Sequence, residues 1–355
     1  MSPKERLVNQ TLRQSADHVP TIGGWILGAS NLAQVAGLSL PAFLEDPFGG
    51  MLKAHLSLGV DGMVSPVVPT SADQIRTGLV EESHFEGIEP EALLEAAEEV
   101  PDEAELVAGF DCTAERARFR AYFEEALSGW SGIVPLPNFW EIGGHFPLYT
   151  QFGYTAFLSA CALYPEAVER IWWGRSVISR QRSKILVDLY RELDLVPTMF
   201  CGEDLCSMRG PLCSVDFLRT RYLPTVRMII EPLVDAGIRM IHHCDGDVRP
   251  IVSDLLDLGF RGFQGFQYEC GVSIAELRSL KTAFGEPPLI WAGLSVSRTL
   301  PFGSEDDVRA EVEGFYRDTD GGHGLFVFTS NVSGVEVAPA NLAAGYRRAQ
   351  QLVVD

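Results

Sequence analysis

Short apolar runs alternate with amphipathic helical stretches along almost the whole chain. Repeated strand–helix alternation predicts parallel strands joined by helical crossovers. Eight strand–helix units in one chain predict an α/β fold of the (β/α)8 type, a TIM-like barrel. The expected strands are residues 19–27, 62–68, 132–140, 195–204, 238–245, 262–267, 288–294 and 324–331, and helical patterns such as residues 154–193, 217–237 and 305–319 lie between them.

We expect a single domain over residues 1–355, because no internal repeat or low-complexity linker divides the chain. A helix is expected before the first strand. Residues 69–131 are too long for one crossover, and they predict extra helices between the second and third strands that cover one end of the barrel. The first strand is not followed by G-x-G-x-x-G, and neither a Walker A motif nor G-x-S-x-G is present. The sequence therefore disfavours a dinucleotide fold, a P-loop and a serine hydrolase.

Charge and composition exclude several other classes. A formal net charge of −20 disfavours nucleic-acid binding, because a surface that negative repels phosphate. The sequence has no apolar run of about 20 residues, so a membrane span is not expected. The amino terminus lacks the pattern of a secretion signal, and the seven cysteines are not spaced like a disulfide framework. We therefore expect a cytoplasmic protein.

Reactive side chains gather where the predicted strands end. The active site of a (β/α)8 barrel is built at the carboxyl ends of its strands, so this convergence predicts an active site there. The residues are Glu141 after the third strand, Glu203 and Asp204 after the fourth, and His242, His243, Cys244 and Asp245 at the fifth. Gln264, Gln267 and Glu269 follow at the sixth, and Ser330 and Asn331 at the eighth.

Strand alternation divides the cluster at residues 242–245 into two opposed pairs. His243 and Asp245 share one side of the strand, and His242 and Cys244 share the other. One pair is expected to point into the barrel mouth and the other toward the helices. Either pair could supply two ligands to a metal ion, a harder set from the first pair and a softer set from the second.

The same alternation separates the two carboxylates after the fourth strand. We expect one of them to face the site and the other to be structural. Asp204 is the predicted catalytic residue, and Glu203 is an alternative metal ligand.

Three segments carry a resemblance to a known family. They are PKERLVNQTLRQSADHVPTIG at the amino terminus, GEDLCSMRGPLCSVDFLRTRYLPTVRMIIEPLVDAGIRMIHHCDGD in the middle, and PFGSEDDVRAEVEGF with GLFVFTSNVSGVEVAPANLAAGY near the end. With these segments the chain resembles the uroporphyrinogen decarboxylase superfamily, whose other large branch is the corrinoid-linked methyltransferases. The resemblance implies a (β/α)8 barrel with its site at the carboxyl-terminal mouth.

The motifs favour the methyltransferase branch. True uroporphyrinogen decarboxylases carry an arginine motif of the type R-Q-A-G-R-Y, where this chain has GWILGASNLAQ. Thiol-directed methyltransferases bind zinc through H-x-C and a later cysteine. Here His242-x-Cys244 would match, but the later region reads FTSNVSG and has no cysteine. Aligning on Gly246 instead gives His243-Cys244-Asp245-Gly246, which looks like the H-x-D-G subgroup of the superfamily.

That subgroup implies methyl transfer between a small methylated substrate and a corrinoid (cobalamin) bound to a partner protein. His243 and Asp245 would bind a metal, with Zn2+ as the candidate, or would handle the proton of the leaving group. Asp204 or Glu203 would complete the site, and the resemblance also implies a homodimer. Residues expected to line the substrate pocket are Glu141, Gln267, Glu269, Ser330 and Asn331.

Two alternatives stay open from the sequence. One is a cofactor-independent decarboxylase, a lyase of a small carboxylic acid or tetrapyrrole. The other is a non-catalytic barrel that binds a tetrapyrrole.

Overall fold

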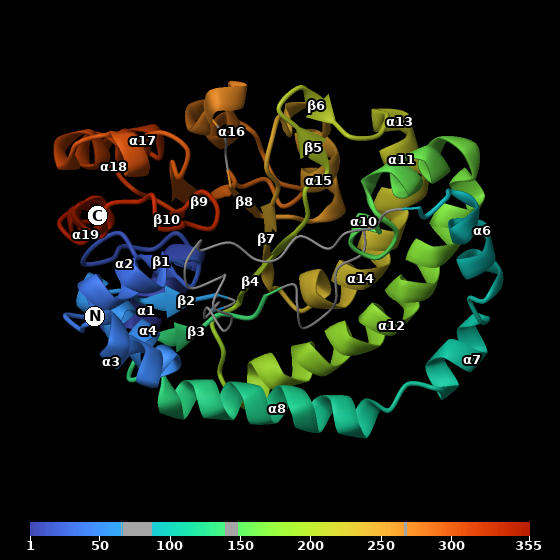
Figure 1. The fold of residues 1–355 in the computed structure, drawn as a ribbon, viewed down its shortest axis with the longest axis horizontal. Helices are drawn as coiled ribbons and strands as arrows, with labels where there is room; N and C mark the ends of the chain where they lie inside the picture. Colours follow the sequence, from blue (N-terminus) through green and yellow to red (C-terminus); the bar gives the residue numbers. More distant parts are fainter. Residues whose placement is uncertain (65, 67–86, 139–147, 266–267) are drawn as a thin grey trace.

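The computed structural model describes residues 1–64, 66, 87–138, 148–265 and 268–355 (Figure 1). Its parallel strands form two sheets. The five-stranded sheet has the order β10-β9-β8-β7-β4, and the three-stranded sheet has the order β1-β2-β3. The bounds are β1 (Ile22–Gly23), β2 (Gly62–Met63), β3 (Val134–Pro135), β4 (Thr198–Gly202), β7 (Arg239–His243), β8 (Gly262–Gln264), β9 (Leu289–Leu294) and β10 (Leu325–Thr329). A short antiparallel hairpin, β5 (Cys206–Ser207) and β6 (Gly210–Pro211), follows β4.

The prediction of parallel α/β architecture is confirmed, since each of these eight parallel strands lies within one predicted range. The closed barrel is supported only in part, because the two sheets are separate ladders. Single parallel bridges, Thr21 to Val327 and Asn138 to Phe200, lie between them. The ladders therefore do not close.

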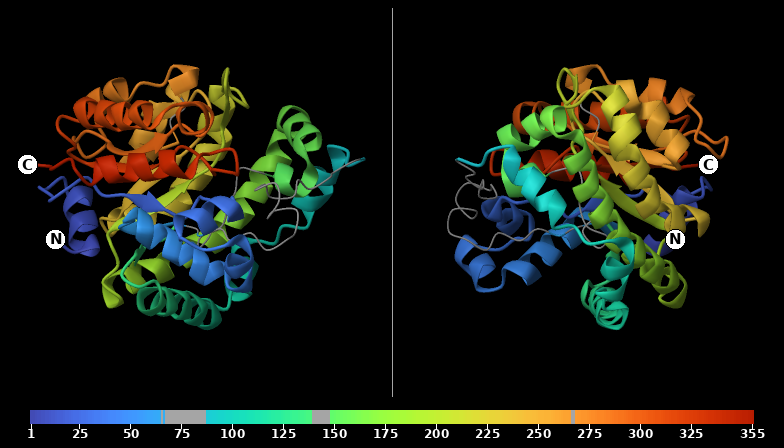
Figure 2. Two further views of the ribbon diagram at one scale, coloured as in Figure 1. Left: turned by 60° about the vertical axis from the view of Figure 1, so that its left-hand side comes forward. Right: turned by 90° about the vertical axis from the view of Figure 1, so that its right-hand side faces the viewer.

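Helices surround the strands (Figures 1 and 2). Those of the first part of the chain are α1 (Pro3–Thr11), α2 (Ala29–Val35), α3 (Leu40–Glu45), α4 (Pro47–Leu58), α6 (Glu91–Glu98), α7 (Glu103–Ala108) and α8 (Cys112–Gly129). Then come α10 (Tyr149–Phe152), α11 (Tyr154–Leu163), α12 (Pro165–Glu192), α13 (Val215–Phe217), the π-helix η1 (Leu218–Tyr222) and α14 (Leu223–Asp235). The last are η2 (Arg249–Ile251), α15 (Val252–Leu258), η3 (Tyr268–Cys270), α16 (Ile274–Ser279), α17 (Thr299–Phe302), α18 (Glu305–Asp318) and α19 (Pro339–Ala349).

Local sequence explains where two of these helices begin. The hydroxyl oxygens of Ser2 and Ser304 each accept a hydrogen bond from the backbone N–H three residues on, and the carboxylate of that residue accepts one from the serine N–H. These reciprocal bonds form capping boxes, which satisfy backbone donors that the first turn of a helix leaves free. None of the helices in the described part of the chain is long and apolar enough to cross a bilayer.

The predicted insertion is helical where the structure describes it. Helices α6, α7 and α8 occupy most of residues 91–129 and pack against the long helix α12. Figure 1 shows α8 running along one side of the molecule, with α6 and α7 beside α12. The single-domain assignment stays a prediction.

Residues of both sheets meet in one apolar cluster. Its members from the strands and their immediate flanks are Ile22, Val64, Leu136, Val196, Phe200, Ile241, Leu289, Trp291, Phe326 and Phe328, all buried. Side chains of the opposite alternation, such as Met240 and Phe263, belong to a second cluster between strands and helices. Successive residues of a strand therefore face different cores, as the pleat requires. Ile241 belongs to the shared inner cluster, so His243, two residues later, is directed to the same side at the strand end.

Candidate active site

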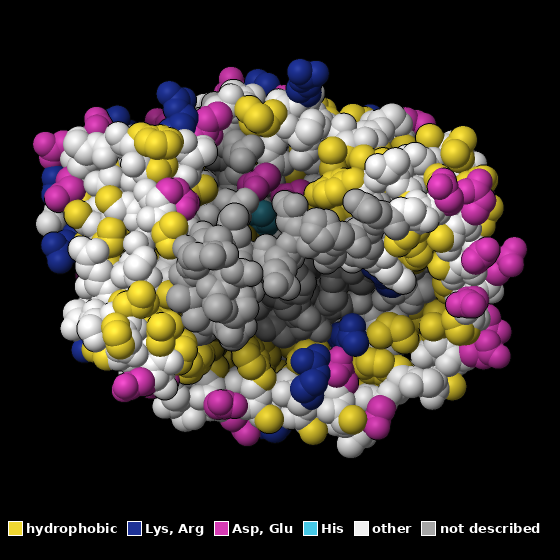
Figure 3. Space-filling view, in the orientation of Figure 1, with side chains coloured by type: hydrophobic (Ala, Val, Ile, Leu, Met, Phe, Trp, Pro, Cys, Tyr) yellow, Lys and Arg dark blue, Asp and Glu magenta, His cyan; other side chains and the backbone are white. Residues whose placement is uncertain are grey.

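The carboxyl ends of β4 and β7 bring three potential metal ligands together. One ligand atom from each of Asp204, His243 and Asp245 lies within 4.8 Å of the others, and this is the one such group of three in the described residues. The side chain of Asp204 is 43% exposed and that of His243 is 12% exposed, so the group opens to solvent on the aspartate side. Figure 3 shows a histidine beside acidic side chains near the centre of this face.

Gln264, the last residue of β8, fixes the proton on His243. Its amide nitrogen donates to the backbone carbonyls of Thr329, over 2.8 Å, and Ser330, over 3.3 Å. Its amide oxygen is therefore turned to Nδ1 of His243, at 2.6 Å. That oxygen can only accept, so Nδ1 carries the proton and Nε2 of the neutral ring presents a lone pair. Nε2 lies 3.5 Å from Oδ1 of Asp204, inside the ligand group.

The two carboxylates are held by a backbone and a side-chain contact. The N–H of Asp245 donates to Oδ1 of Asp204 over 2.8 Å. The side-chain amide of Asn331 donates to Oδ2 of Asp245. Oδ1 of Asp245 is buried and has no hydrogen-bond partner among the described residues. A buried carboxylate oxygen without a donor is costly in a metal-free site and is satisfied by a cation.

The pKa of the Asp245 carboxyl is raised to about 6, chiefly by burial. The carboxylates of Asp204 and Glu269 raise this pKa further, while His243 and the hydrogen bond from Asn331 oppose the rise. Desolvation disfavours the charged carboxylate and so favours the protonated one. Asp245 is therefore poised to exchange a proton near neutral pH.

A glycine next to Gln264 leaves room for the imidazole. Gly265 has φ +89°, and a Cβ built there would lie 2.7 Å from Nδ1 of His243 and 2.9 Å from Cε1. Contacts this short displace a side chain, and the left-handed backbone adds strain for any other residue. Glycine is thus required here for the ring to hold its position.

Aromatic rings support the other side of the imidazole. The Trp25 ring meets His243 edge to face at a centroid distance of 5.2 Å, and the Phe200 ring lies at 5.8 Å. Trp25 also contacts Phe200 and Phe328. Sequence analysis missed Trp25, because its position beside a residue more than 200 places later depends on the tertiary fold. The signal it did offer was an aromatic residue close to the predicted end of the first strand.

The opposite pair on β7 faces the helices. The His242 ring packs edge to face on Phe260 at 4.8 Å and on Phe263 at 6.5 Å, and burial lowers its pKa to about 3. The thiol of Cys244 donates to the carbonyl oxygen of Asp245 over 3.1 Å. Neither residue joins a group of three potential ligands in the part of the chain that the structure describes. Among the described residues the softer His242/Cys244 pair therefore gains no third ligand, and its use as a metal site stays a prediction.

Glu203 is also directed away from the ligand group. It is buried, and its Oε2 accepts a hydrogen bond from the Tyr222 hydroxyl over 2.9 Å. Gly202 has φ +115°, which turns the chain at the end of β4. As a result Asp204, and not Glu203, is the carboxylate beside His243. The structure thus places Asp204 in the group of three potential ligands and leaves Glu203 outside that group.

The predicted pocket-lining residues have different surroundings. Glu269 accepts from the hydroxyls of Ser295, over 2.7 Å, and Ser297, over 3.0 Å. Ser330 accepts from the N–H of Val296 over 3.1 Å, while Asn331 reaches Asp245. Glu269 and Ser295 also line a cavity of about 450 Å³ beside α17. Glu141 and Gln267, also predicted for the pocket, lie outside the described residues.

The donor set fits a divalent metal ion. One imidazole nitrogen and two carboxylate oxygens are ligands that Zn2+ accepts, and three protein ligands leave a position for a reacting group. The Gln264 contact matches the outer hydrogen bond that orients most metal-bound histidines. Oδ1 of Asp245, which is buried and has no hydrogen-bond partner among the described residues, is a second reason to expect a bound cation. Asp204, His243 and Asp245 can therefore hold such an ion.

Comparisons with known proteins give similarity in structure only. No protein-family model matches the sequence. No curated protein matches it either. Among solved structures, the chain is similar to a methyltransferase from Methanosarcina mazei, with a TM-score of 0.63 and 17% sequence identity over 98% of each chain. At that identity the comparison shows a shared fold along nearly the whole length of both chains.

Proposed function

We propose that this protein is a methyltransferase that moves a methyl group between a small methylated substrate and a corrinoid on a partner protein. The observation that carries the proposal is the ligand group of Asp204, His243 and Asp245 at the strand ends. The structural neighbour is named a methyltransferase. The motif His243-Cys244-Asp245-Gly246 resembles the corrinoid-linked H-x-D-G subgroup. We take the two sheets with their single bridges as a (β/α)8 barrel whose closure is incomplete.

In the proposed reaction the methyl group is transferred to the reduced corrinoid, and bonds and electron pairs balance. The bond between methyl carbon and heteroatom breaks, and its electron pair leaves with the heteroatom. Cob(I)alamin on the partner supplies the pair for the new carbon–cobalt bond. The departing heteroatom then takes one proton. A divalent ion at Asp204, His243 and Asp245 would supply Lewis acidity to the heteroatom.

The residues of this chain have distinct tasks in that reaction. Nε2 of His243 is held as a lone-pair donor by the hydrogen bond at Nδ1. Asp245 contributes the buried, unpartnered Oδ1. The side chain of Asp204 is 43% exposed, so solvent, which supplies the proton that the departing heteroatom takes, reaches the group on this side. Trp25 and Phe200 exclude water from the other face of the imidazole.

The test is methyl transfer to cob(I)alamin with a panel of methoxylated and methylamine substrates, followed by the visible spectrum of the corrinoid. His243→Ala should lower the rate by about a hundredfold or more, since it removes a ligand and its proton control. His323→Ala is the matched control, because His323 lies just before β10, at the opposite strand ends. Both variants are compared in thermal unfolding.

Unaltered transfer in His243→Ala would overturn the role of the site. The same assay measures carbon dioxide. Its release from a carboxylic acid without corrinoid would instead identify the decarboxylase alternative. Tight cobalamin or porphyrin binding without any turnover would identify the non-catalytic barrel.

A further inference from the structure

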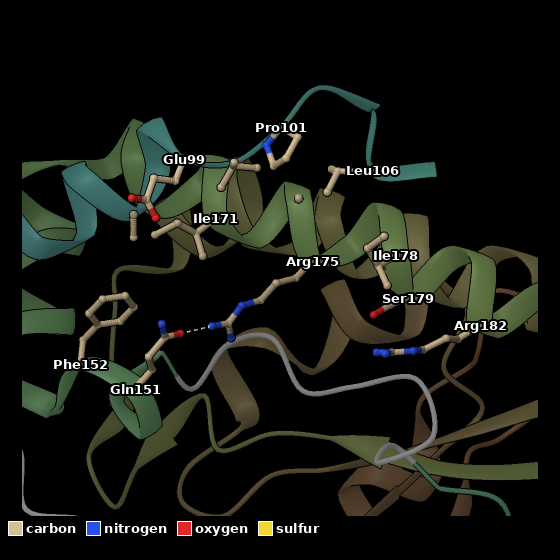
Figure 4. A pocket seen from close by; sticks show the side chains of 13 residues that line it. Glu99, Pro101, Leu106, Gln151, Phe152, Ile171, Arg175, Ile178, Ser179 and Arg182 are labelled. Carbon is tan, nitrogen blue, oxygen red and sulfur yellow. Dashed lines mark hydrogen bonds between the residues drawn. The ribbon is translucent and has the colours of Figure 1, made fainter. Parts of the chain in front are cut away.

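A cavity of about 530 Å³ lies between α12 and the helices of the insertion, apart from the ligand group (Figure 4). Its volume is in the range of small-molecule sites, roughly 300–1,000 Å³. Most of its wall is apolar. Its lining residues come from α6, α7, α10, α12 and the loop after α6, and the apolar ones include Val100, Leu106, Phe152, Ile171 and Ile178.

Arg175 extends across this cavity from the middle of α12 (Figure 4). One N–H of its guanidinium donates to the side-chain oxygen of Gln151 over 2.6 Å. No carboxylate lies within ion-pair distance of Arg175 among the described residues, and its other N–H groups have no partner there. Burial lowers the pKa of Arg175, and the more distant Glu203 carboxylate opposes that effect. Arginine keeps its proton even so.

The other charged residues of the wall do not neutralise Arg175. Arg182, two turns along α12, is paired with Glu115 at 2.6 Å. Glu99 lies on the opposite side of the cavity in Figure 4 and makes no ion pair with Arg175. In a chain with a net charge of −20, an arginine in an apolar cavity without a carboxylate partner is unusual. An anion would satisfy it.

We infer that this cavity binds an amphipathic carboxylate, with the acid group on the Arg175 guanidinium and an apolar chain against Ile171, Ile178 and Phe152. The planar guanidinium matches a carboxylate in a bidentate arrangement. The apolar wall favours a hydrocarbon body and disfavours a small inorganic anion. The site does not depend on methyl transfer, because it uses none of the metal-ligand group.

Calorimetric titration with octanoate tests the site, with octylamine as the probe of reversed charge. Octanoate should bind the wild type, and octylamine should not. Arg175→Gln should weaken octanoate binding by about tenfold to a hundredfold, the range expected for charge-assisted hydrogen bonds. Arg180→Gln is the matched control, since Arg180 lies on the same helix, pairs with Glu231 at 3.0 Å and does not line the cavity. It should bind octanoate like the wild type.

A second variant leaves Arg175 in place. Ile178→Glu puts a carboxylate three residues along the helix, where it can pair with Arg175, and should weaken octanoate binding at least as much as Arg175→Gln does. Thermal unfolding confirms that each variant is folded. The inference is overturned if the wild type does not bind octanoate at millimolar concentration. It is also overturned if Arg175→Gln binds octanoate as the wild type does, or if octylamine binds equally well.

Discussion

The amide oxygen of Gln264 accepts a hydrogen bond from Nδ1 of His243 over 2.6 Å. The amide cannot turn over, because its nitrogen donates to two backbone carbonyls at the end of β10. The sheet thus determines which nitrogen of His243 carries the proton, through a side chain that is not itself a member of the ligand group. This relationship leads to the first prediction.

Gln264→Leu should weaken Zn2+ binding by about tenfold to a hundredfold, the usual effect of losing the hydrogen bond behind a histidine ligand. Gln264→Glu should retain more of the affinity, because a carboxylate still accepts from Nδ1. Both affinities are measured by competition with a chromophoric chelator. Equal affinities in the wild type and Gln264→Leu would show that the tautomer of His243 is set by something else.

Gly265→Ala should impair the site without unfolding the protein. The new Cβ would meet the His243 ring, which must then move. Gly285→Ala provides a matched control: Gly285 also has positive φ, +80° against +89° for Gly265, but a Cβ there meets nothing within 4 Å. Each variant should lose about 1–2 kcal/mol from the left-handed backbone. Only Gly265→Ala should lose Zn2+ affinity, and comparable losses in both would refute the steric argument.

Metal binding should weaken as the pH falls below about 6, because Asp245, with a pKa of about 6 in the metal-free fold, must lose its proton to become a ligand.

The free energy of unfolding of the metal-free protein should depend on pH in the opposite direction. The pKa of Asp245 in the fold lies above its ordinary value of 3.8, so burial of the charged form costs stability as the pH rises from 4 to 6. Asp245→Asn removes that cost and should stabilise the metal-free protein at pH 7 by on the order of 2 kcal/mol.

Urea unfolding of the metal-free wild type and Asp245→Asn at pH 4 and pH 7 measures this difference. The gain from Asp245→Asn should be present at pH 7 and small at pH 4. A variant that is less stable than the wild type at pH 7 would contradict the assigned burial cost.

His242 predicts a separate loss of stability in acid. Its pKa falls from 6.5 to about 3 on folding, so its neutral form contributes stability that is fully present above pH 6.5 and is lost as the pH falls toward 3. His242→Phe keeps a ring against Phe260 and removes an Nδ1 that has no partner among the described residues. Between pH 6 and pH 4 its unfolding free energy should depend on pH less steeply than that of the wild type, by about 1.4 kcal/mol per unit. Parallel curves for the two proteins would contradict a buried neutral imidazole.

The parts of the fold and site that could be predicted are those that depend on the pattern of apolar and polar residues within one strand or helix. Period-two alternation separated His243 and Asp245 from His242 and Cys244, and the structure directs these pairs to opposite sides. The strands were found because each is a short apolar run between helical patterns. Both results depend only on the geometry of one element at a time.

The remaining features depend on contacts between distant elements. Alternation alone could not choose between Glu203 and Asp204, because both acids follow the last ladder residue of β4, Gly202, whose positive φ turns the chain there. Gln264 at the end of β8 and Trp25 after β1 contact His243 from other parts of the chain, and a single sequence does not reveal such pairs. Whether the two sheets join depends on the short edge strands β1 and β3, beside which only single bridges connect the sheets among the described residues. The homodimer and the corrinoid partner stay predictions.

The central claim is that Asp204, His243 and Asp245 form one metal site, and calorimetric titration of chelator-treated protein with Zn2+ tests it most directly. The account predicts about one ion per chain, with affinity reduced by tenfold or more in Asp204→Asn and in Asp245→Asn, and saturable binding lost in His243→Ala. Binding to His243→Ala with the stoichiometry and affinity of the wild type, or no binding to the wild type at all, would contradict it.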